Sequence, residues 1–153
     1  MVKGSRGRKA KKPVARKEPQ RSKNPRLAES PESLNGRRIS WHLGLIDDDG
    51  PFGWQTVSRA ELFDICRSKF KSFETMTWNE VLGRRHHQLS PDSLSEAAKA
   101  RLRAINQDDA IEQIVSFALG GKPRVIGIRD RAIFKILWYD PQHQVCPSTL
   151  QRT

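Results

Sequence analysis

The feature that most constrains this fold is the uneven distribution of charge and aromatic residues along the chain. Residues 1–38 hold thirteen Lys and Arg against three Glu, and they contain no aromatic residue. Prolines recur every six residues from Pro13 to Pro31 and prevent a continuous helix there. We therefore expect residues 1–38 to form a disordered cationic tail and residues 39–150 to form one folded domain.

The basic residues of the tail predict contact with a polyanion. Lys9, Lys11 and Lys12 belong to one such run. Basic runs bind phosphates by releasing counterions, with little preference for base sequence. The alternative is a solubilising tail with no dedicated target. The other 115 residues carry fifteen basic and fourteen acidic side chains, so a folded site must belong to this nearly neutral part.

Composition also limits the class of protein. A domain of this size can bury a core without disulfides or metal. Cys66 and Cys146 are the only cysteines, which is typical of reduced thiols in an intracellular protein, and we expect Cys66 in the core. No apolar run approaches the roughly 20 residues of a membrane helix, and the N-terminus lacks the pattern of a secretory signal. We expect a cytoplasmic protein with no membrane partner.

Three capping boxes predict three helix starts, because a Ser or Thr that stands three residues before a Glu satisfies the free N–H groups of a first turn. The boxes are Ser58 with Glu61, Thr77 with Glu80, and Ser93 with Glu96. Apolar residues recur at helical spacing after the first and third boxes, and we expect them to face a core. They are Leu62, Phe63, Ile65, Cys66, Phe70 and Phe73 in the first helix, and Leu94, Ala98, Leu102 and Ile105 in the third.

Alternating or β-branched apolar segments predict strands over residues 39–45, 115–119, 124–128 and 132–139. Only turns separate the last three, so they form an antiparallel meander. The order of elements predicts an α+β domain with helices packed on one face of a small antiparallel sheet. Alternation predicts that Lys135, Leu137 and Tyr139 share one face of the last strand.

Basic residues surround this predicted meander. They are Lys122, Arg124, Arg129, Arg131 and Lys135. His143 follows in the turn after the last strand. Arginine and lysine stabilise a phosphate under attack, and histidine transfers protons near neutral pH. The pattern predicts a surface that grips an RNA backbone. The alternative is that these charges line the solvated face of the sheet.

Other polar clusters give weaker signals. Residues 83–88 form a predicted basic loop, with Arg84, Arg85 and two histidines, that contacts phosphate or simply lies on the surface. No Cys, Asp or Glu stands at ligand spacing around it, so zinc is not expected. Asp47, Asp48 and Asp49 lack the spacing of a calcium loop. We therefore expect neither metal nor cofactor. The four tryptophans border apolar patterns and predict core packing.

Segments 73–78, 120–128 and 137–145 resemble a family of small, mostly uncharacterised bacterial proteins. The second half of the chain also resembles the RelE/YoeB group of toxins, where a helical pair precedes an antiparallel sheet and a Gly-containing turn leads into an Arg-bearing strand. The resemblance implies an mRNA endoribonuclease, ribosome-dependent or free, that a partner antitoxin neutralises. In it, Arg124 corresponds to a basic residue at the start of the second sheet strand, and His143 to a C-terminal His or Tyr.

The chain departs from the toxin pattern at two points. Residues 132–134 occupy the position at which the toxins usually have an Arg that begins the following strand. The pattern also includes an acidic general base on the helices, for which Glu96 and Glu112 are the candidates, and neither is assigned. The leading hypothesis is a metal-independent endoribonuclease in which Arg124 and Lys122 hold the phosphate, His143 is the general acid, and Tyr139 or Trp138 orients a base. The alternatives are a non-catalytic module that binds RNA, DNA or the ribosome, and a protein-interaction component.

Overall fold

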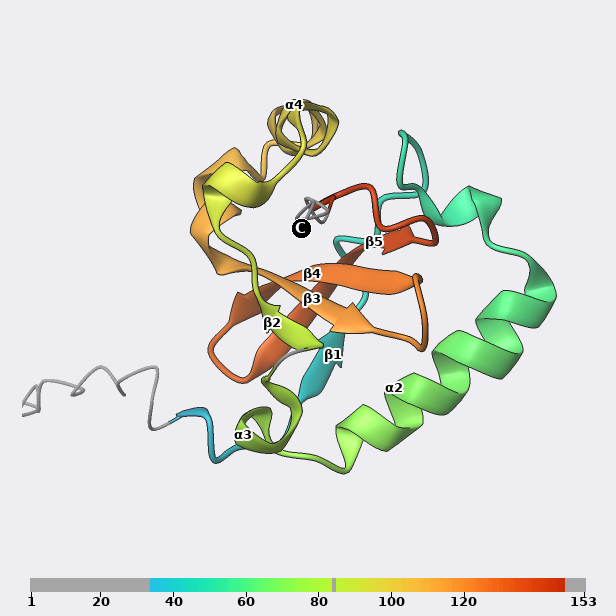
Figure 1. The fold of residues 1–153 in the computed structure, drawn as a ribbon. Helices are drawn as coiled ribbons and strands as arrows, with labels where there is room; N and C mark the ends of the chain where they lie inside the picture. The colour runs from blue at the N-terminus through green and yellow to red at the C-terminus, as the bar shows by residue number, and fades with distance from the viewer. Residues whose placement is uncertain (1–33, 84, 148–153) are drawn as a thin grey trace, which may run out of the picture.

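The structure is a computed structural model that describes residues 34–83 and 85–147 (Figure 1). The tail lysines Lys9, Lys11 and Lys12 lie outside the described residues, and so does Arg84.

The folded domain begins earlier than residue 39. Leu34 is buried, and the backbone N–H of Trp78 donates to the carbonyl of Arg37 at 3.0 Å. The N–H of Asn79 donates in the same way to the carbonyl of Asn35 at 2.8 Å. Residues 34–38 were predicted to belong to the tail, but an apolar side chain and free backbone acceptors attach them to the body.

Within residues 34–83 and 85–147, five strands form one mixed sheet in the order β1-β5-β4-β3-β2. The antiparallel part comprises β2 (His86–Gln88), β3 (Ile114–Ala118), β4 (Arg124–Asp130) and β5 (Ile133–Asp140). β1 (Ser40–His42) pairs in parallel with β5. The meander is confirmed, but the prediction of a wholly antiparallel sheet is wrong. Parallel neighbours need a long crossover, and here nearly the whole domain separates β1 from β5.

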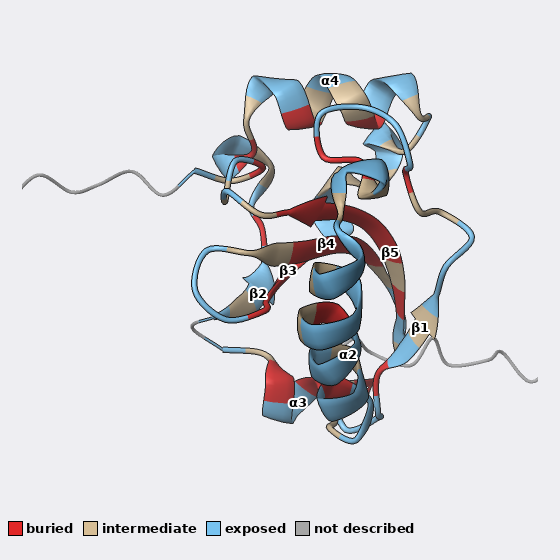
Figure 2. Cartoon of the chain, turned by 90° about the vertical axis from the view of Figure 1, so that its right-hand side faces the viewer, coloured by how far each residue is buried: buried red, intermediate tan, exposed pale blue. Residues whose placement is uncertain are grey.

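Helices cover both faces of this sheet. One face packs against η2 (Glu61–Cys66), α2 (Arg67–Glu74) and α3 (Trp78–Val81), and the other against α4 (Glu96–Ala104). Short 3₁₀ segments lie between these helices and strands: η1 (Trp54–Thr56), η3 (Pro91–Ser93) and η4 (Asp108–Gln113). Figure 2 shows the buried strands between these layers. The predicted single covered face is therefore wrong, because β3 and most of β5 are apolar on both sides.

Two of the three predicted capping boxes are present. Ser58 and Glu61 exchange reciprocal hydrogen bonds of 2.9 and 3.1 Å, and Thr77 caps α3 in the same way with Glu80. The third box is wrong. Ser95 caps α4 by accepting from the N–H of Ala98, because Pro91–Ser93 forms a separate 3₁₀ turn. Local capping chemistry thus located each helix within a few residues.

The first helix departs from regular α geometry at its start. Glu61–Cys66 is π-helical, and its wider turn changes the angular spacing of its side chains. Cys66 is fully buried, as predicted, and burial raises the pKa of its thiol to about 11. In contrast, Leu62 and Phe63 are 48% and 60% exposed, although both were predicted to face the core. An assumed α-helical period assigns the wrong face to these two residues.

A register shift between β4 and β5 changes which side chains share a face. Ile126 pairs with Trp138, but Gly127 already pairs with Ile136, so Leu137 is an extra residue. Gly127 permits this, because a Cβ there would collide with the carbonyl of Lys135 and the ring of Phe134. Leu137 and Trp138 both pack on the α4 face, and Tyr139 is placed on the α2 face.

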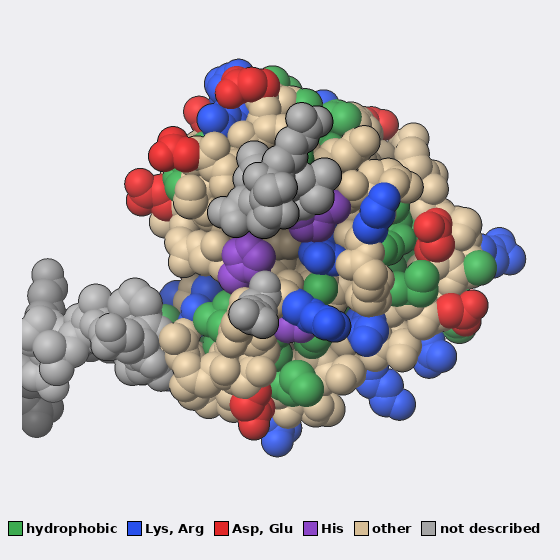
Figure 3. All heavy atoms as spheres, in the orientation of Figure 1, with side chains coloured by type: hydrophobic (Ala, Val, Ile, Leu, Met, Phe, Trp, Pro, Cys, Tyr) green, Lys and Arg blue, Asp and Glu red, His purple; other side chains and the backbone are tan. Residues whose placement is uncertain are grey.

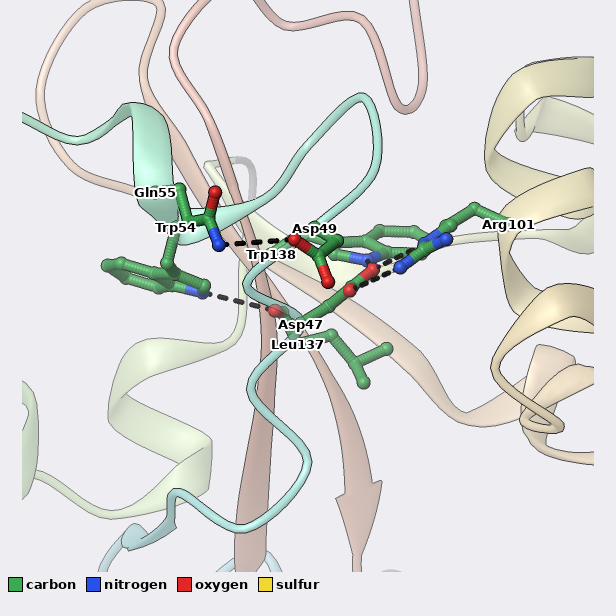
Figure 4. A network of polar contacts seen from close by, with 7 residues as sticks. All are labelled: Asp47, Asp49, Trp54, Gln55, Arg101, Leu137 and Trp138. Atoms are coloured by element: carbon green, nitrogen blue, oxygen red, sulfur yellow. Dashed lines mark hydrogen bonds and ion pairs between the residues drawn. The ribbon is translucent and has the colours of Figure 1, made fainter.

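Asp47, the first of the three aspartates after β1, attaches the α4 layer to the sheet. Arg101 of α4 forms a bidentate pair with the Asp47 carboxylate, at 2.8 and 2.7 Å, and the indole N–H of Trp138 donates to it at 2.9 Å (Figure 4). Burial acts to raise the pKa of Asp47, but these hydrogen bonds from Arg101 and Trp138 outweigh it and lower that pKa. Asp47 is therefore a buried structural anion.

In the described part of the chain, no helix combines the length and apolar character needed to cross a membrane.

Candidate functional site

A small pocket opens at the end of the sheet where β4 begins and β5 ends, on the α4 face. Its polar lining consists of His87, Ser116, Arg124, Asp140 and His143, and its apolar lining of Leu89, Ile126 and Cys146. The cavity measures about 20 Å³, close to the space for one water molecule. In Figure 3, histidine and basic side chains gather around this region, over β2, β3 and β4.

The turn between β3 and β4 positions Arg124. Gly120 and Gly121 adopt φ values of 101° and 69°, which favour glycine and allow the tight turn. Nη1 of Arg124 donates to the carbonyls of Gly121, Lys122 and Pro123, at 2.5, 3.1 and 3.1 Å. A guanidinium carries five N–H donors. This anchor leaves the donors on Nε and Nη2 without a partner among the described residues.

Asp140 organises the turn that carries His143. The Asp140 carboxylate is 2% exposed and accepts from the backbone N–H groups of Gln144 and Val145, at 2.9 and 2.8 Å. His143 adopts a left-handed φ of 58° within this turn. The carbonyl of Val145 also accepts from the N–H of Ser95 at the start of α4. The Asp140 carboxylate and the N-cap residue of α4 therefore fix the backbone of the turn that brings His143 to the pocket.

The two adjacent histidines of β2 lie on opposite faces, as strand geometry requires. Nδ1 of His86 accepts from the N–H of Ala118 at 2.9 Å, and its ring packs against Phe73 and Phe117. His87 is exposed and lines the pocket. The segment was predicted to be a loop, but it pairs with β3 and forms one of the two edge strands of the described sheet.

The charged groups among the described lining residues are Arg124 and Asp140, and Arg85 acts on Arg124 from nearby. Burial lowers the pKa of Arg124, Asp140 opposes that shift, and Arg85 adds to it. Arginine nevertheless stays protonated at neutral pH, because its ordinary pKa is above 12. Among the described lining residues Asp140 is the one carboxylate, and it accepts hydrogen bonds from two backbone N–H groups. The donors of Arg124 that have no described partner can therefore bind an anionic group.

Arg124 and His143, predicted from the sequence as members of one site, line the same pocket. Tyr139, predicted to act with them, lies 1% exposed on the opposite face, where its hydroxyl donates to Glu61 at 3.4 Å. The extra residue Leu137 is the physical reason, because it reverses the alternation before Tyr139. Trp138, predicted as the alternative to Tyr139 for orienting a base, is buried beneath α4 and offers no stacking surface, so that role is wrong and the predicted core packing is confirmed.

The predicted basic rim divides into two groups at opposite ends of the hairpin. Arg129 lies five residues from Arg124 along β4, about 17 Å at strand spacing. Its guanidinium stacks 4.1 Å above the Trp78 ring, donates to the Asn35 side chain at 2.6 Å, and lies on the α2 face. Lys135 pairs with Asp130 at 2.8 Å near the same end.

The remaining predicted phosphate contacts have mixed positions. Arg131 occupies the β4–β5 turn with a φ of 60°, at the hairpin end away from the pocket. Arg85 precedes β2 and is exposed near the pocket, and Lys122 is exposed in the β3–β4 turn beside Arg124. Neither Arg85 nor Lys122 lines the pocket itself.

Sequence reasoning missed three members of the lining. His87 and Ser116 were not assigned to the site with Arg124 and His143, and Asp140 was noted only as the start of the turn that carries His143, with no role of its own. The alternation of His86 and His87 across a strand is the signal for the first of them, once residues 86–88 are assigned to a strand instead of a loop. The role of Asp140 has a local signal too, since a short acidic side chain before a turn often accepts backbone N–H groups.

In the described residues, no three or more His, Cys, Asp or Glu side chains group in positions that could hold a metal ion. Comparisons of the chain with protein-family models, curated proteins and solved structures found no match.

Proposed function

We propose that this protein binds RNA at the pocket of Arg124 and His143 and cleaves the phosphodiester backbone there, as a metal-independent endoribonuclease. The observation that carries the proposal is that these two residues, from different parts of the chain, line one small pocket. RNA carries its own nucleophile, the 2′-hydroxyl, so the protein needs to supply only charge stabilisation and proton transfer.

Arg124 is suited to hold the scissile phosphate. Arginine binds phosphate oxygens through parallel N–H donors, and charge-assisted hydrogen bonds of this kind are stronger than neutral ones. The anchoring of Nη1 by three carbonyls reduces the side-chain freedom that binding would otherwise cost. A fixed guanidinium beside the phosphate would stabilise the charge that develops on its oxygens during attack.

The pocket size supports a surface-bound polymer as the ligand. A cavity of about 20 Å³ accommodates a single water-sized group. One non-bridging phosphate oxygen has that size, whereas a whole nucleotide or sugar does not. We infer that a strand of RNA lies across the mouth and inserts one phosphate oxygen, with His143 beside the departing 5′-oxygen.

The same small volume favours a second candidate, a non-catalytic module that binds phosphates of RNA or DNA. In that case Arg124 contributes to affinity and the imidazole of His143 transfers no proton. This candidate predicts salt-sensitive binding with no change in the nucleic acid. A binding assay alone therefore does not separate the two candidates, and cleavage must be measured.

The test uses the full chain with a labelled mRNA, in the presence and absence of ribosomes. We expect cleavage by the wild type and a loss of 100-fold or more in His143→Ala and Arg124→Met. His42→Ala and Arg59→Met are matched controls, because both residues are exposed and neither lines the pocket. Both controls should cleave like the wild type.

Each alternative has its own outcome. Binding that weakens in Arg124→Met without any cleavage by the wild type would favour the non-catalytic module. Growth arrest on expression, relieved by His143→Ala, would support the toxin hypothesis and justify a search for its antitoxin. If the wild type cleaves no RNA in the presence of ribosomes and causes no growth arrest, the proposed function is overturned.

A further inference from the structure

We propose that His87 is a second catalytic residue of this pocket, acting as the general base that removes the proton of the RNA 2′-hydroxyl. The inference rests on the proposed function and completes it, since proton transfer in transesterification needs a base as well as an acid. The juxtaposition of two imidazoles around one arginine, on three different elements, is the observation behind it.

The position of the neighbouring residue His86 shows on which face of the sheet the side chain of His87 lies. His86 occupies the α2 face, where Nδ1 accepts from the Ala118 N–H and the ring is wedged between Phe73 and Phe117. Successive side chains of a strand point to opposite faces. The His86 contacts therefore place His87 on the α4 face, beside Leu89 in the pocket lining.

Three separate segments bring the two imidazoles and Arg124 to one pocket. His87 pairs with Ser116 on β3, and Ser116 pairs in turn with Ile126, two residues along β4 from Arg124. Arg124 begins β4, and its partner Asp140 ends β5, immediately before the turn that carries His143. The pocket lining therefore receives one imidazole from the β2 edge and one from the turn after β5.

In-line attack places the entering and leaving oxygens on opposite sides of phosphorus, and we assign one imidazole of the pocket to each. His87 accepts the 2′-hydroxyl proton while the 2′-oxygen forms its bond to phosphorus. The bond from phosphorus to the 5′-oxygen breaks, and His143 donates a proton to that oxygen. The products are a 2′,3′-cyclic phosphate and a 5′-hydroxyl, and solvent returns each histidine to its starting state.

The experiment separates the base from the acid by changing the leaving group. The full chain acts on RNA of ordinary chemistry and on RNA in which sulfur replaces the departing 5′-oxygen, because a thiolate leaves without being protonated. We expect His143→Ala to lose 100-fold or more on ordinary RNA and to recover most of that loss on the sulfur substrate. His87→Ala should lose 100-fold or more on both substrates.

Controls and contrary outcomes complete the design. His42→Ala should match the wild type on both substrates, and melting curves should show that all variants are folded. Wild-type rates for His87→Ala, rescue of His87→Ala by sulfur, or a product without the cyclic phosphate would each overturn the role of His87 while the proposed cleavage stands. A wild type that cleaves neither RNA would overturn the proposed function itself, and the role of His87 with it.

Discussion

The two faces of the sheet use neighbouring residues for different purposes. On the α2 face, His86, Arg129 and Tyr139 make internal contacts with a backbone N–H, aromatic rings, a side-chain amide or a carboxylate. On the α4 face, His87 and Arg124 line an open pocket. Residue type therefore does not decide the role, and the face on which a side chain lies does. Substitutions of matched residues on the two faces test this distinction.

The largest effect should come from Asp140. Asp140→Ala leaves the buried N–H groups of Gln144 and Val145 without their acceptor, at an expected cost of about 2–4 kcal/mol in the free energy of unfolding. The turn of His143 should loosen as well, so RNA cleavage or binding should also fall. Urea unfolding and RNA assays measure both. Asp140→Asn keeps one acceptor oxygen, so its loss in the free energy of unfolding should lie between zero and that of Asp140→Ala. If Asp140→Ala costs less than Asp140→Asn, Asp140 is not the anchor of this turn.

The two arginines of β4 should separate stability from activity. Arg129→Met removes the contact with Trp78 and the hydrogen bond to Asn35, at about 1–2 kcal/mol of stability. Arg124→Met should cost less than about 1 kcal/mol, because its partners are carbonyls of an exposed turn. RNA assays on folded protein should show the reverse ranking. Equal losses of stability would remove the contrast between the two ends of the strand.

Much of the fold follows from local patterns in the chain. The strands of the meander and the first two capped helices are predicted because β-branched runs and capping boxes act over a few residues. Three features escape such patterns. β2 has no apolar alternation and forms because β3 offers a free edge, the π-helical turn changes a helical period, and the Leu137 bulge depends on pairing between two strands.

The candidate site was predictable in part for the same reason. Arg124 and His143 are chemically conspicuous beside a predicted turn, and both do line the pocket. The role of Tyr139 could not be judged, because a one-residue bulge reverses its face. His87 depended on recognising β2. Misassigned strand geometry, and not misjudged residue chemistry, therefore accounts for most of the errors at the site.

The adjacent histidines should differ in how pH affects stability. Burial, helped by Arg124 and other positive groups, lowers the pKa of His86 from its ordinary 6.5, so the folded state disfavours the proton. Because the unfolded chain binds it more readily, the free energy of unfolding should decline as pH falls below about 6.5. His86→Gln should flatten this decline, and His87→Gln should retain it. Urea unfolding between pH 5 and 8 measures both, and an unchanged slope in His86→Gln would contradict the assignment.

The smallest effect should come from Tyr139. Burial raises the pKa of its phenol to about 12, and the nearby Glu61 adds to the shift, so the hydroxyl stays protonated and donates one long bond of 3.4 Å. Tyr139→Phe should therefore cost only about 0.5 kcal/mol, since the ring contact with Trp54 remains. RNA cleavage should be unchanged, because the hydroxyl lies on the far side of the sheet from Arg124. A 10-fold loss of cleavage in a fully folded Tyr139→Phe would mean that the two faces communicate, and the division of roles between them would then be wrong.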